Sequence, residues 1–338
     1  MSSPLITVLI TVYNGGEYLK TAVESILAQT FHDFEFLIIN DCSKDGSAAV
    51  IQSYRDERIR LHNNEVNLGQ TRSLNKGLSL ARGKYIARID ADDMAFPAWL
   101  KTQRDYIAGH PQCVVVSCKG AVMNGVEEIK KILNTPLSYE EMIFKSLTAS
   151  PLNHVGSLYD KDAIIAAGGY DENFKIAADY ELWSKLVRQG RLLASTNDVL
   201  VAIRVHEKSI SIMERGGTDL KEISEVMARN FQALTTTILE KEDVVLIWKL
   251  IYAVEYLSDQ EFSRGQGLLA RAYTSFRPEL PLDPKSVQDF WRRQRRVIGV
   301  KRIFLKWAGQ PLLKIFPAFY EAVNRRLAQK RMKHPILR

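Results

Sequence analysis

The chain has 338 residues, of which 46% are hydrophobic and 25% are charged, and its formal net charge at pH 7 is +7. This length exceeds one typical domain, so we expect more than one structural part. The three cysteines are an odd number without metal-ligand spacing, which excludes a disulfide framework and the common zinc sites. No uncharged apolar run reaches the ~18 residues of a membrane-spanning helix, so none is expected. The N-terminus leads directly into a predicted strand, so we also expect no signal peptide.

Short apolar segments and amphipathic segments alternate along the first 90 residues. The predicted strands are 5–12, 34–39, 59–61 and 85–89, and the predicted helices are 17–29, 47–54 and 71–81. The strand segments are apolar and rich in β-branched residues, which is typical of strands covered on both faces. The alternation predicts an α/β fold, with a parallel sheet between two layers of helices.

Polar residues follow three of these strands at the point where each strand ends. They are Thr11 and Tyr13, then Asp41 and Asp45, and finally Asp90, Asp92 and Asp93. In an open parallel sheet these strand ends share one edge, which is where ligands bind. Three carboxylates within four residues repel one another unless a cation lies among them. Because oxygen ligands favour Mg²⁺ or Mn²⁺, the last group predicts a divalent-metal site, with a solvated acidic turn as the alternative.

Several longer segments occur in a characteristic order. They are 7–14 (TVLITVYN), 25–31 (SILAQTF), 39–47 (INDCSKDGS), 67–69 (NLG), 77–78 (GL), 83–93 (GKYIARIDADD), 168–171 (GGYD), 178–183 (ADYELW) and 204–211 (RVHEKSIS). In this order and at these spacings they resemble the motifs of family 2 glycosyltransferases, over about residues 5–212. The resemblance implies a GT-A fold, which is a mainly parallel central sheet flanked by helices. It also implies transfer of a sugar from a nucleotide diphosphate sugar.

The resemblance places the donor at the strand-end loops. The nucleotide-sugar-binding residues that it implies are Thr11, Tyr13, Asp41, Arg72, Asp90 and Arg204. A tyrosine ring can cover a nucleobase, and a carboxylate can accept hydrogen bonds from the base or the ribose. Asp90 and Asp92 match the family's Asp-x-Asp motif, in which Asp90 would face the ribose and Asp92 would bind Mn²⁺ or Mg²⁺. His206 is implied as a second metal-binding group, and a structural histidine is the alternative.

Glycosyl transfer also needs a base that removes the proton of the acceptor hydroxyl. Asp179 matches the family's base, although its place at the start of an apparent helix would also suit a simple helix cap. A single base acting opposite the leaving group would invert the anomeric carbon through an oxocarbenium-like transition state. His154 and Gly169 are predicted to lie on the acceptor side. The chain departs from the usual pattern at Asn40, Cys42 and Ala178, and the last of these leaves the acceptor preference open.

The C-terminal part differs in composition from the rest. Residues 219–275 have helical periodicity, which predicts a bundle that follows a hinge near 214–217. Residues 291–338 hold 14 basic residues and one acidic residue, whereas residues 1–290 hold 32 basic and 38 acidic residues. Bulky apolar residues alternate with these charges, which predicts short helices, broken at Pro311 and Pro317, on an anionic membrane surface. A helical cap on the catalytic domain and a nucleic-acid-binding segment are the alternatives, but no nucleic-acid recognition motif is present.

The sequence therefore predicts a GT-A catalytic domain over 1–215, a helical bundle extension over 216–290 and a basic amphipathic tail over 291–338. We expect an inverting, metal-dependent glycosyltransferase that uses a nucleotide-diphosphate sugar, with a UDP-sugar as the first choice. Its acceptor would be a glycan or lipid-linked glycan in cell-surface polysaccharide synthesis. We expect a cytoplasmic protein, peripheral on the inner face of the cell membrane, with no nucleic-acid partner. A non-catalytic nucleotide-sugar binding protein of the same fold is the alternative.

Overall fold

The computed structural model describes residues 3–124, 127–133, 135, 138–206, 218–252, 257–276 and 284–308. The described chain forms two compact units, the first containing the described residues up to Leu234 and the second beginning at Thr235. The predicted hinge at 214–217 lies outside the described residues. Helix α9 (Thr218–Leu234), which the sequence assigned to the bundle, is grouped by its contacts with the first unit. The division into three parts stays a prediction.

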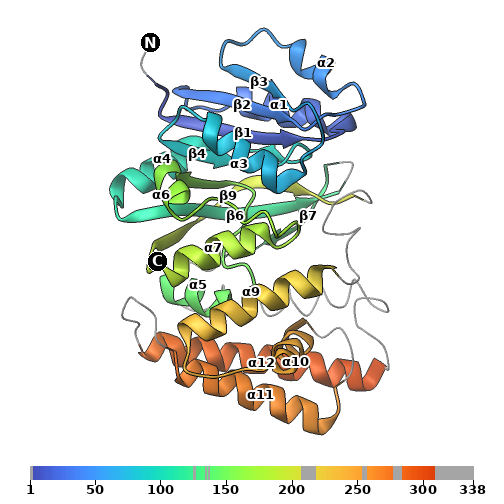
Figure 1. Ribbon diagram of the computed structural model, residues 1–338, viewed down its shortest axis with the longest axis vertical. Helices are drawn as coiled ribbons and strands as arrows, with labels where there is room; N and C mark the ends of the chain where they lie inside the picture. Colours follow the sequence, from blue (N-terminus) through green and yellow to red (C-terminus); the bar gives the residue numbers. More distant parts are fainter. Residues whose placement is uncertain are drawn as a thin grey trace. The chain divides into compact units, whose positions relative to one another are not determined.

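A mixed sheet runs through the first unit (Figure 1). Its strands are β1 (Ile6–Val12), β2 (Phe34–Asn40), β3 (Ile59–Asn63), β4 (Tyr85–Arg88), β5 (Met94–Ala95), β6 (Cys113–Met123), β7 (Ile129–Leu133), β8 (Ser157–Asp160) and β9 (Leu192–Arg204). Their order in space is β3-β2-β1-β4-β8-β6-β9-β5, and β7 pairs with β6. Strands β1 to β4 are parallel, β8 is antiparallel to β4 and β6, and β9 is parallel to β6. The predicted parallel arrangement is confirmed for the first four strands.

Helices pack on both faces of this sheet, as predicted. In the first unit they are η1 (Gly16–Tyr18), α1 (Leu19–Leu27), α2 (Ser47–Gln52), α3 (Gln70–Leu80), α4 (Trp99–Gly109), α5 (Tyr139–Ser146), α6 (Lys161–Ala166), α7 (Ala178–Arg188) and α9. Alternate residues of β1 lie on the two faces of the sheet, because successive side chains of a strand point to opposite sides. Val8 and Ile10 are buried in one core with Val23 of α1, whereas Leu9 contacts Gly77 of α3.

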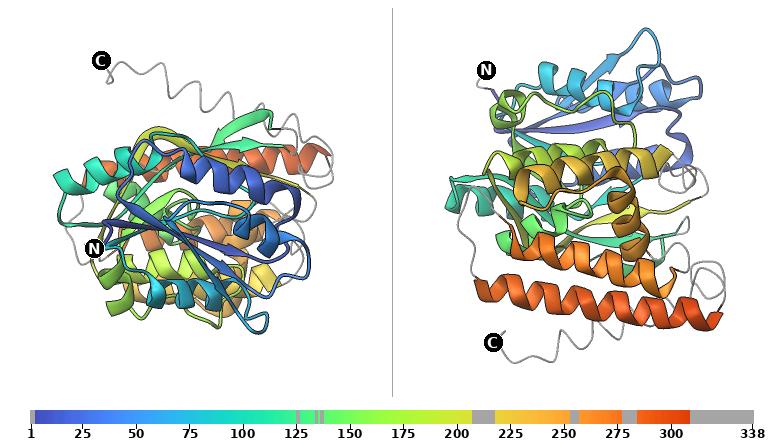
Figure 2. Two further views of the ribbon diagram at one scale, coloured as in Figure 1. Left: turned by 90° about the horizontal axis from the view of Figure 1, so that it is seen from above. Right: turned by 60° about the horizontal axis from the view of Figure 1, so that its bottom comes forward.

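Three helices of the second unit are described, α10 (Lys241–Tyr252), α11 (Asp259–Thr274) and α12 (Pro284–Ala308). The rings of Phe290 and Trp291 lie 5.9 and 5.0 Å from the ring of Tyr273, which holds α12 beside α11 (Figure 2). Ile298 of α12 is also buried. Helix α12 passes through the predicted limit at 290/291, while residues 309–338, with both tail prolines, lie outside the described residues. None of the described helices combines the length and the apolar character needed to span a membrane.

Candidate active site

The structure brings the three predicted carboxylates together at the carboxyl end of β4. Asp90, Asp92 and Asp93, here called the acidic cluster, each offer an oxygen atom within 4.8 Å of the others. Asp90 forms an ion pair with Arg88, the last residue of β4, and accepts a hydrogen bond of 3.1 Å from the side-chain amide of Gln70. Burial raises the pKa of Asp90, while the charge of Arg88 acts in the opposite direction. A set of carboxylate oxygens at this edge has the chemistry that Mg²⁺ and Mn²⁺ prefer.

The members of the acidic cluster have different surroundings. Asp93 is only 2% exposed, and its Oδ1 accepts the backbone N–H of Arg204 at 2.7 Å. Burial, together with the charges of Asp90 and Asp92, raises the pKa of Asp93 well above its usual value. Asp92 is partly exposed, and its Oδ2 lies 3.0 Å from Nε2 of His206. Asp93 therefore anchors the end of β9, whereas Asp92 and His206 form the pair that a ligand can reach.

The buried guanidinium of Arg204 contacts the acidic cluster and its neighbours. Its Nε donates to the backbone carbonyl of Asp92 at 2.9 Å, and its Nη2 donates to the carboxylate of Glu127 at 3.1 Å. The guanidinium also lies 4.4 Å above the ring of Tyr18, whose centroid is 5.0 Å from that of the His206 ring. Arg204 is only 3% exposed. With these contacts, its buried side chain positions Asp92 and His206. Direct contact of Arg204 with a diphosphate stays a prediction.

The residues predicted for the nucleoside lie on the neighbouring loops. Asp41 accepts hydrogen bonds of 2.8 Å from the side-chain amide of Asn64 and from the backbone N–H groups of Leu68 and Gly69. Gly69 has a φ of +83°, which glycine adopts without strain and which lets the loop close on this carboxylate. Asp41 is thus buried and shapes the loop after β3. Its predicted contact with the nucleoside stays a prediction.

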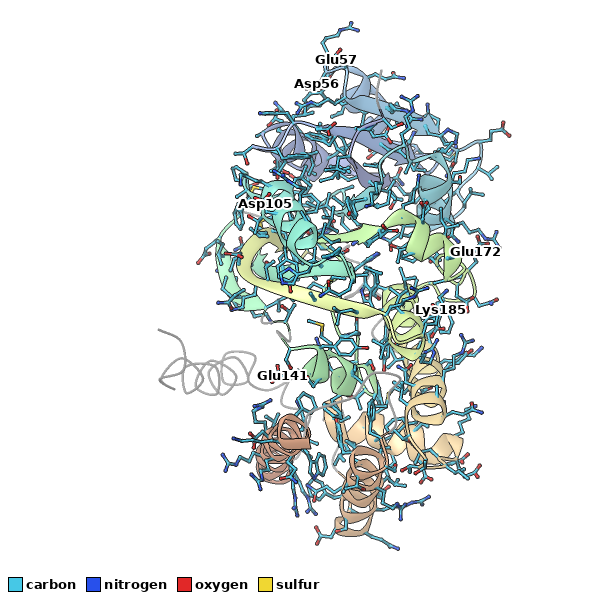
Figure 3. The ribbon with its side chains drawn as sticks, turned by 90° about the vertical axis from the view of Figure 1, so that its left-hand side faces the viewer. Asp56, Glu57, Asp105, Glu141, Glu172 and Lys185 are labelled. Atoms are coloured by element: carbon cyan, nitrogen blue, oxygen red, sulfur yellow. The ribbon has the colours of Figure 1, made fainter. Side chains whose placement is uncertain are left out.

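Three other predicted donor residues are reachable from solvent. The side chain of Tyr13, just beyond β1, is 53% exposed, and Thr11 is half-buried. Arg72 lies on α3 and forms an exposed ion pair of 3.2 Å with Glu172, which Figure 3 labels. An exposed pair of this kind holds the arginine only weakly, so a ligand can compete for it. Tyr13 and Arg72 can therefore be reached by a ligand, and their contact with the nucleotide-sugar donor stays a prediction.

Asp179 lies in the first turn of α7, where it was predicted. Its Oδ2 accepts a hydrogen bond of 3.3 Å from the hydroxyl of Ser150. Burial raises the pKa of Asp179, and the backbone N–H of Tyr180 and the charge of Arg88 partly offset that effect. A carboxylate with a raised pKa is the stronger base. Because Arg88 pairs with Asp90 and its charge also acts on Asp179, the buried guanidinium links the acidic cluster to the Asp179 side of the site.

His154 and Gly169, predicted on the acceptor side, contribute to a buried polar group near α7. Nε2 of His154 lies 2.8 Å from the hydroxyl of Tyr170, which lies 3.0 Å from the hydroxyl of Tyr159. Burial lowers the pKa of His154 well below its usual value, so its imidazole is neutral. The carbonyl of Gly169 accepts a hydrogen bond of 2.7 Å from Lys185 of α7, labelled in Figure 3. These contacts fix the loop before α7, and contact of either residue with an acceptor stays a prediction.

Glu222 of α9 is a site residue that the sequence analysis missed. Its buried carboxylate accepts hydrogen bonds of 2.8–3.0 Å from the backbone N–H groups of Lys175, Ile176 and Ala177. These three residues lead directly into α7, and α9 runs beside that helix (Figure 1). The position of Asp179 therefore depends on a carboxylate from another helix. No local sequence signal marks Glu222, because only the fold brings it to these donors.

We expect Glu222→Ala to lower the free energy of unfolding by about 2–4 kcal/mol, because buried backbone donors lose a charged acceptor. Sugar transfer should fall as well, since the segment before Asp179 is released. Urea unfolding and an activity assay measure the two effects. Glu225→Ala is the matched control on the same helix, where the exposed carboxylate pairs with Arg229 at 2.6 Å. It should cost less than about 1 kcal/mol, and equal losses in both variants would contradict the assignment.

Comparisons with known proteins identify the family and the fold that this chain resembles. The family model described as Glycosyl transferase family 2 matches residues 7–166 of this chain. An uncharacterized glycosyltransferase of Methanocaldococcus jannaschii is 32% identical over 214 residues, which cover 61% of this chain and 72% of that protein. The amylovoran biosynthesis glycosyltransferase AmsE of Erwinia amylovora is 29% identical, covering 59% of this chain and 76% of its own length. The crystal structure of S. aureus TarS 1–349 in complex with UDP-GlcNAc superposes with a TM-score of 0.59 at 18% identity, covering 92% of this chain and 93% of that one.

The chain belongs to glycosyltransferase family 2, and its first unit has the GT-A fold that this family was expected to have. It is a glycosyltransferase.

Proposed function

We propose that this glycosyltransferase transfers a sugar from a UDP-sugar to a hydroxyl group of a glycan or lipid-linked glycan in the synthesis of a cell-surface polysaccharide. The acidic cluster at the end of β4, with Asp179 linked to it through Arg88, is the observation that carries the proposal. The TarS structure contains UDP-GlcNAc, which supports a UDP-sugar donor. AmsE acts in amylovoran biosynthesis, which supports a polysaccharide product.

Asp92 and His206 would hold a Mn²⁺ or Mg²⁺ ion beside the donor diphosphate. The fit rests on the partly exposed Asp92 carboxylate and on the oxygen ligands gathered around it. When bound, such an ion offsets the negative charge that develops on the leaving diphosphate. Asp90 would accept hydrogen bonds from the ribose, and Arg88 and Gln70 fix its carboxylate for that purpose.

Asp179 would act as the base. The acceptor oxygen forms its bond to the anomeric carbon, Asp179 takes the hydroxyl proton, and the nucleoside diphosphate leaves from the opposite face with the electron pair of the broken bond. A single displacement of this kind inverts the anomeric configuration. Ser150 orients the Asp179 carboxylate through its hydroxyl group.

A thermal-shift panel of UDP, dTDP, GDP and CDP, with and without Mn²⁺, tests the donor assignment. A ligand that binds only the folded protein raises its melting temperature, and at one ligand concentration a tighter ligand gives the larger rise. We expect UDP with Mn²⁺ to give the largest rise. A rise with none of the four nucleotides would contradict the donor site. UDP binding without any release of UDP from UDP-sugars would favour the non-catalytic alternative.

The exposed side of α12 supports a cytoplasmic enzyme held on the inner face of the cell membrane. Arg292, Arg295 and Arg296 are exposed on this helix, whereas Phe290 and Ile298 are buried in the second unit. Helices with a basic face bind anionic lipid surfaces without crossing the bilayer. Helix α12 thus packs its buried residues in the second unit and presents its exposed arginines as a positively charged face.

Changing Arg292, Arg295 and Arg296 together to Gln should weaken binding to anionic vesicles about a hundredfold, since each charge near such a surface contributes about 1 kcal/mol. Vesicle sedimentation measures the loss, and added salt should reduce the wild-type binding as well. Lys101, Lys130 and Lys131 are also exposed, so changing these three to Gln gives a control with the same change in net charge. Unchanged vesicle binding of the triple variant would exclude α12 as the anchor.

A further inference from the structure

Lys145 is a partly buried cation with no assigned role in the proposed reaction. It lies near the end of α5, one helical turn after Glu141, which Figure 3 labels. The carbonyl of the next residue, Ser146, accepts hydrogen bonds from Tyr180 of α7 at 2.7 Å and from Asn230 of α9. The end of α5 is therefore fixed to the two helices that position Asp179.

Within the part of the chain that the structure describes, the ammonium group of Lys145 has little of the bonding that a partly buried cation needs. Among the described residues its ammonium group contacts the carbonyl of Pro151 at 3.5 Å, the outer limit of a hydrogen bond, and forms no ion pair with any of them. Burial lowers the pKa of Lys145 to about 8, although the negative charge of Asp179 acts against this shift. Because this value still lies above 7, the ammonium form of Lys145 predominates at neutral pH. A partly buried charge with no ion pair among the described residues is unfavourable, and a ligand that supplies a counter-charge would stabilise it.

Two other lysines of the first unit show the usual solution. Lys185 of α7 donates to the carbonyl of Gly169 at 2.7 Å, and Lys161 of α6 donates to the carbonyl of Ala81 at 3.2 Å. Both contacts have ordinary hydrogen-bond lengths and close a loop against a helix. The contact of Lys145 is longer than either. Because an ammonium group has three donors, the single contact that Lys145 makes with the described residues leaves donors for a ligand.

Lys145 and Asp179 approach the same segment of chain. Ser150, which donates to Asp179, is the residue before Pro151, whose carbonyl faces Lys145. An acceptor hydroxyl at Asp179 would thus bring neighbouring groups of the acceptor toward Lys145. A compact ammonium recognises phosphate or carboxylate oxygens as a point charge.

We propose that Lys145 forms an anion subsite that binds a phosphate or carboxylate group of the acceptor, and that the enzyme therefore glycosylates an acidic glycan or a phosphate-linked acceptor. The inference rests on the proposed role of Asp179 as the base. It assigns the acceptor a negative charge close to the hydroxyl that is glycosylated.

Chemical labelling of Lys145 in the wild-type protein tests the subsite without knowledge of the acceptor. Limited acetylation followed by mass spectrometry gives the labelling rate of Lys145, with Lys161 as the internal control. The rate is compared with methyl phosphate, methyl glucuronide or neutral methyl glucoside present, both with and without UDP and Mn²⁺ in the donor site. We expect an anion at about four times its Kd to slow labelling of Lys145 about fivefold and to leave Lys161 unchanged. Protection by methyl phosphate or by the glucuronide tells which oxyanion the subsite takes.

A pair of variants separates charge from packing. Lys145→Met keeps a stem of similar length without charge and should abolish the stabilisation that the protecting anion gives in a thermal-shift assay. Lys145→Arg should retain most of it. Equal labelling rates with the anions and the neutral sugar would overturn the subsite, even where UDP and Mn²⁺ still bind and the proposed function stands. If UDP does not bind to the wild-type protein, the proposed donor site is wrong. The subsite is still tested in that case, because the labelling of Lys145 is also measured without UDP.

Discussion

Asp179→Asn should bind UDP and Mn²⁺ as the wild-type enzyme does, yet transfer sugar about 10²–10⁴ times more slowly. The amide has the shape of the carboxylate and can still accept the hydrogen bond from Ser150, which is 3.3 Å in the wild-type structure. It cannot take a proton from the acceptor hydroxyl. In the proposed arrangement, donor binding depends instead on the acidic cluster, which this change does not alter. Isothermal titration with UDP and a coupled assay of UDP release with acceptor measure the two properties.

The control for this variant is Asp162→Asn, which changes an exposed acid in the first turn of α6. It should leave both properties unchanged. The pH profile adds a second criterion. Burial raises the pKa of Asp179, and the ionised form is the active one, so wild-type transfer should decline as the pH falls through a value above the usual range of aspartate. Full activity of Asp179→Asn, or an unchanged acid limb in its profile, would remove Asp179 as the base.

The part of the fold that the sequence predicted is the part with local signals. Strands β1, β2 and β4 are mainly apolar segments, and their predicted limits agree with the structure within a residue or two. The rest of the sheet depends on pairing between distant segments, such as β6 with β9 and β4 with β8. Apolar periodicity marks a strand but not its partner, so the change from a parallel to a mixed sheet after β4 could not be predicted.

The same distinction holds for the candidate site. The acidic cluster was predictable because its three carboxylates are neighbours in the chain and follow a strand. Glu222 and Lys145 were not, because each acts on a segment that only the fold brings near. Asp41 shows a third case, in which the predicted position is right at the sheet edge but the buried carboxylate binds backbone groups of its own chain. A motif identifies such a residue without telling whether it touches the ligand or shapes the loop that does.

Asp92→Ala should weaken the Mn²⁺-dependent binding of UDP about a hundredfold or more, since even changes behind the metal ligands cost 10–100-fold. Asp92 is the most informative member of the acidic cluster. Its carboxylate is partly exposed and faces His206 at 3.0 Å, so its loss leaves the surrounding core intact. Asp93 would be a poor choice, because its buried carboxylate holds the backbone of Arg204 and its removal would disturb β9. Isothermal titration of UDP in Mn²⁺ and in EDTA separates the metal-dependent part of the binding.

Two further variants make the result specific. Asp105→Ala removes an acid on α4 that pairs with Lys101 and Arg104 on the surface, labelled in Figure 3, and should leave UDP binding unchanged. His206→Ala should cause a smaller loss than Asp92→Ala, since imidazole suits Mn²⁺ less well than a carboxylate does. If His206→Ala has no effect while Asp92→Ala has its full effect, the histidine only orients Asp92. If UDP binds equally well to Asp92→Ala and to the wild type in Mn²⁺, the metal does not bind at the acidic cluster.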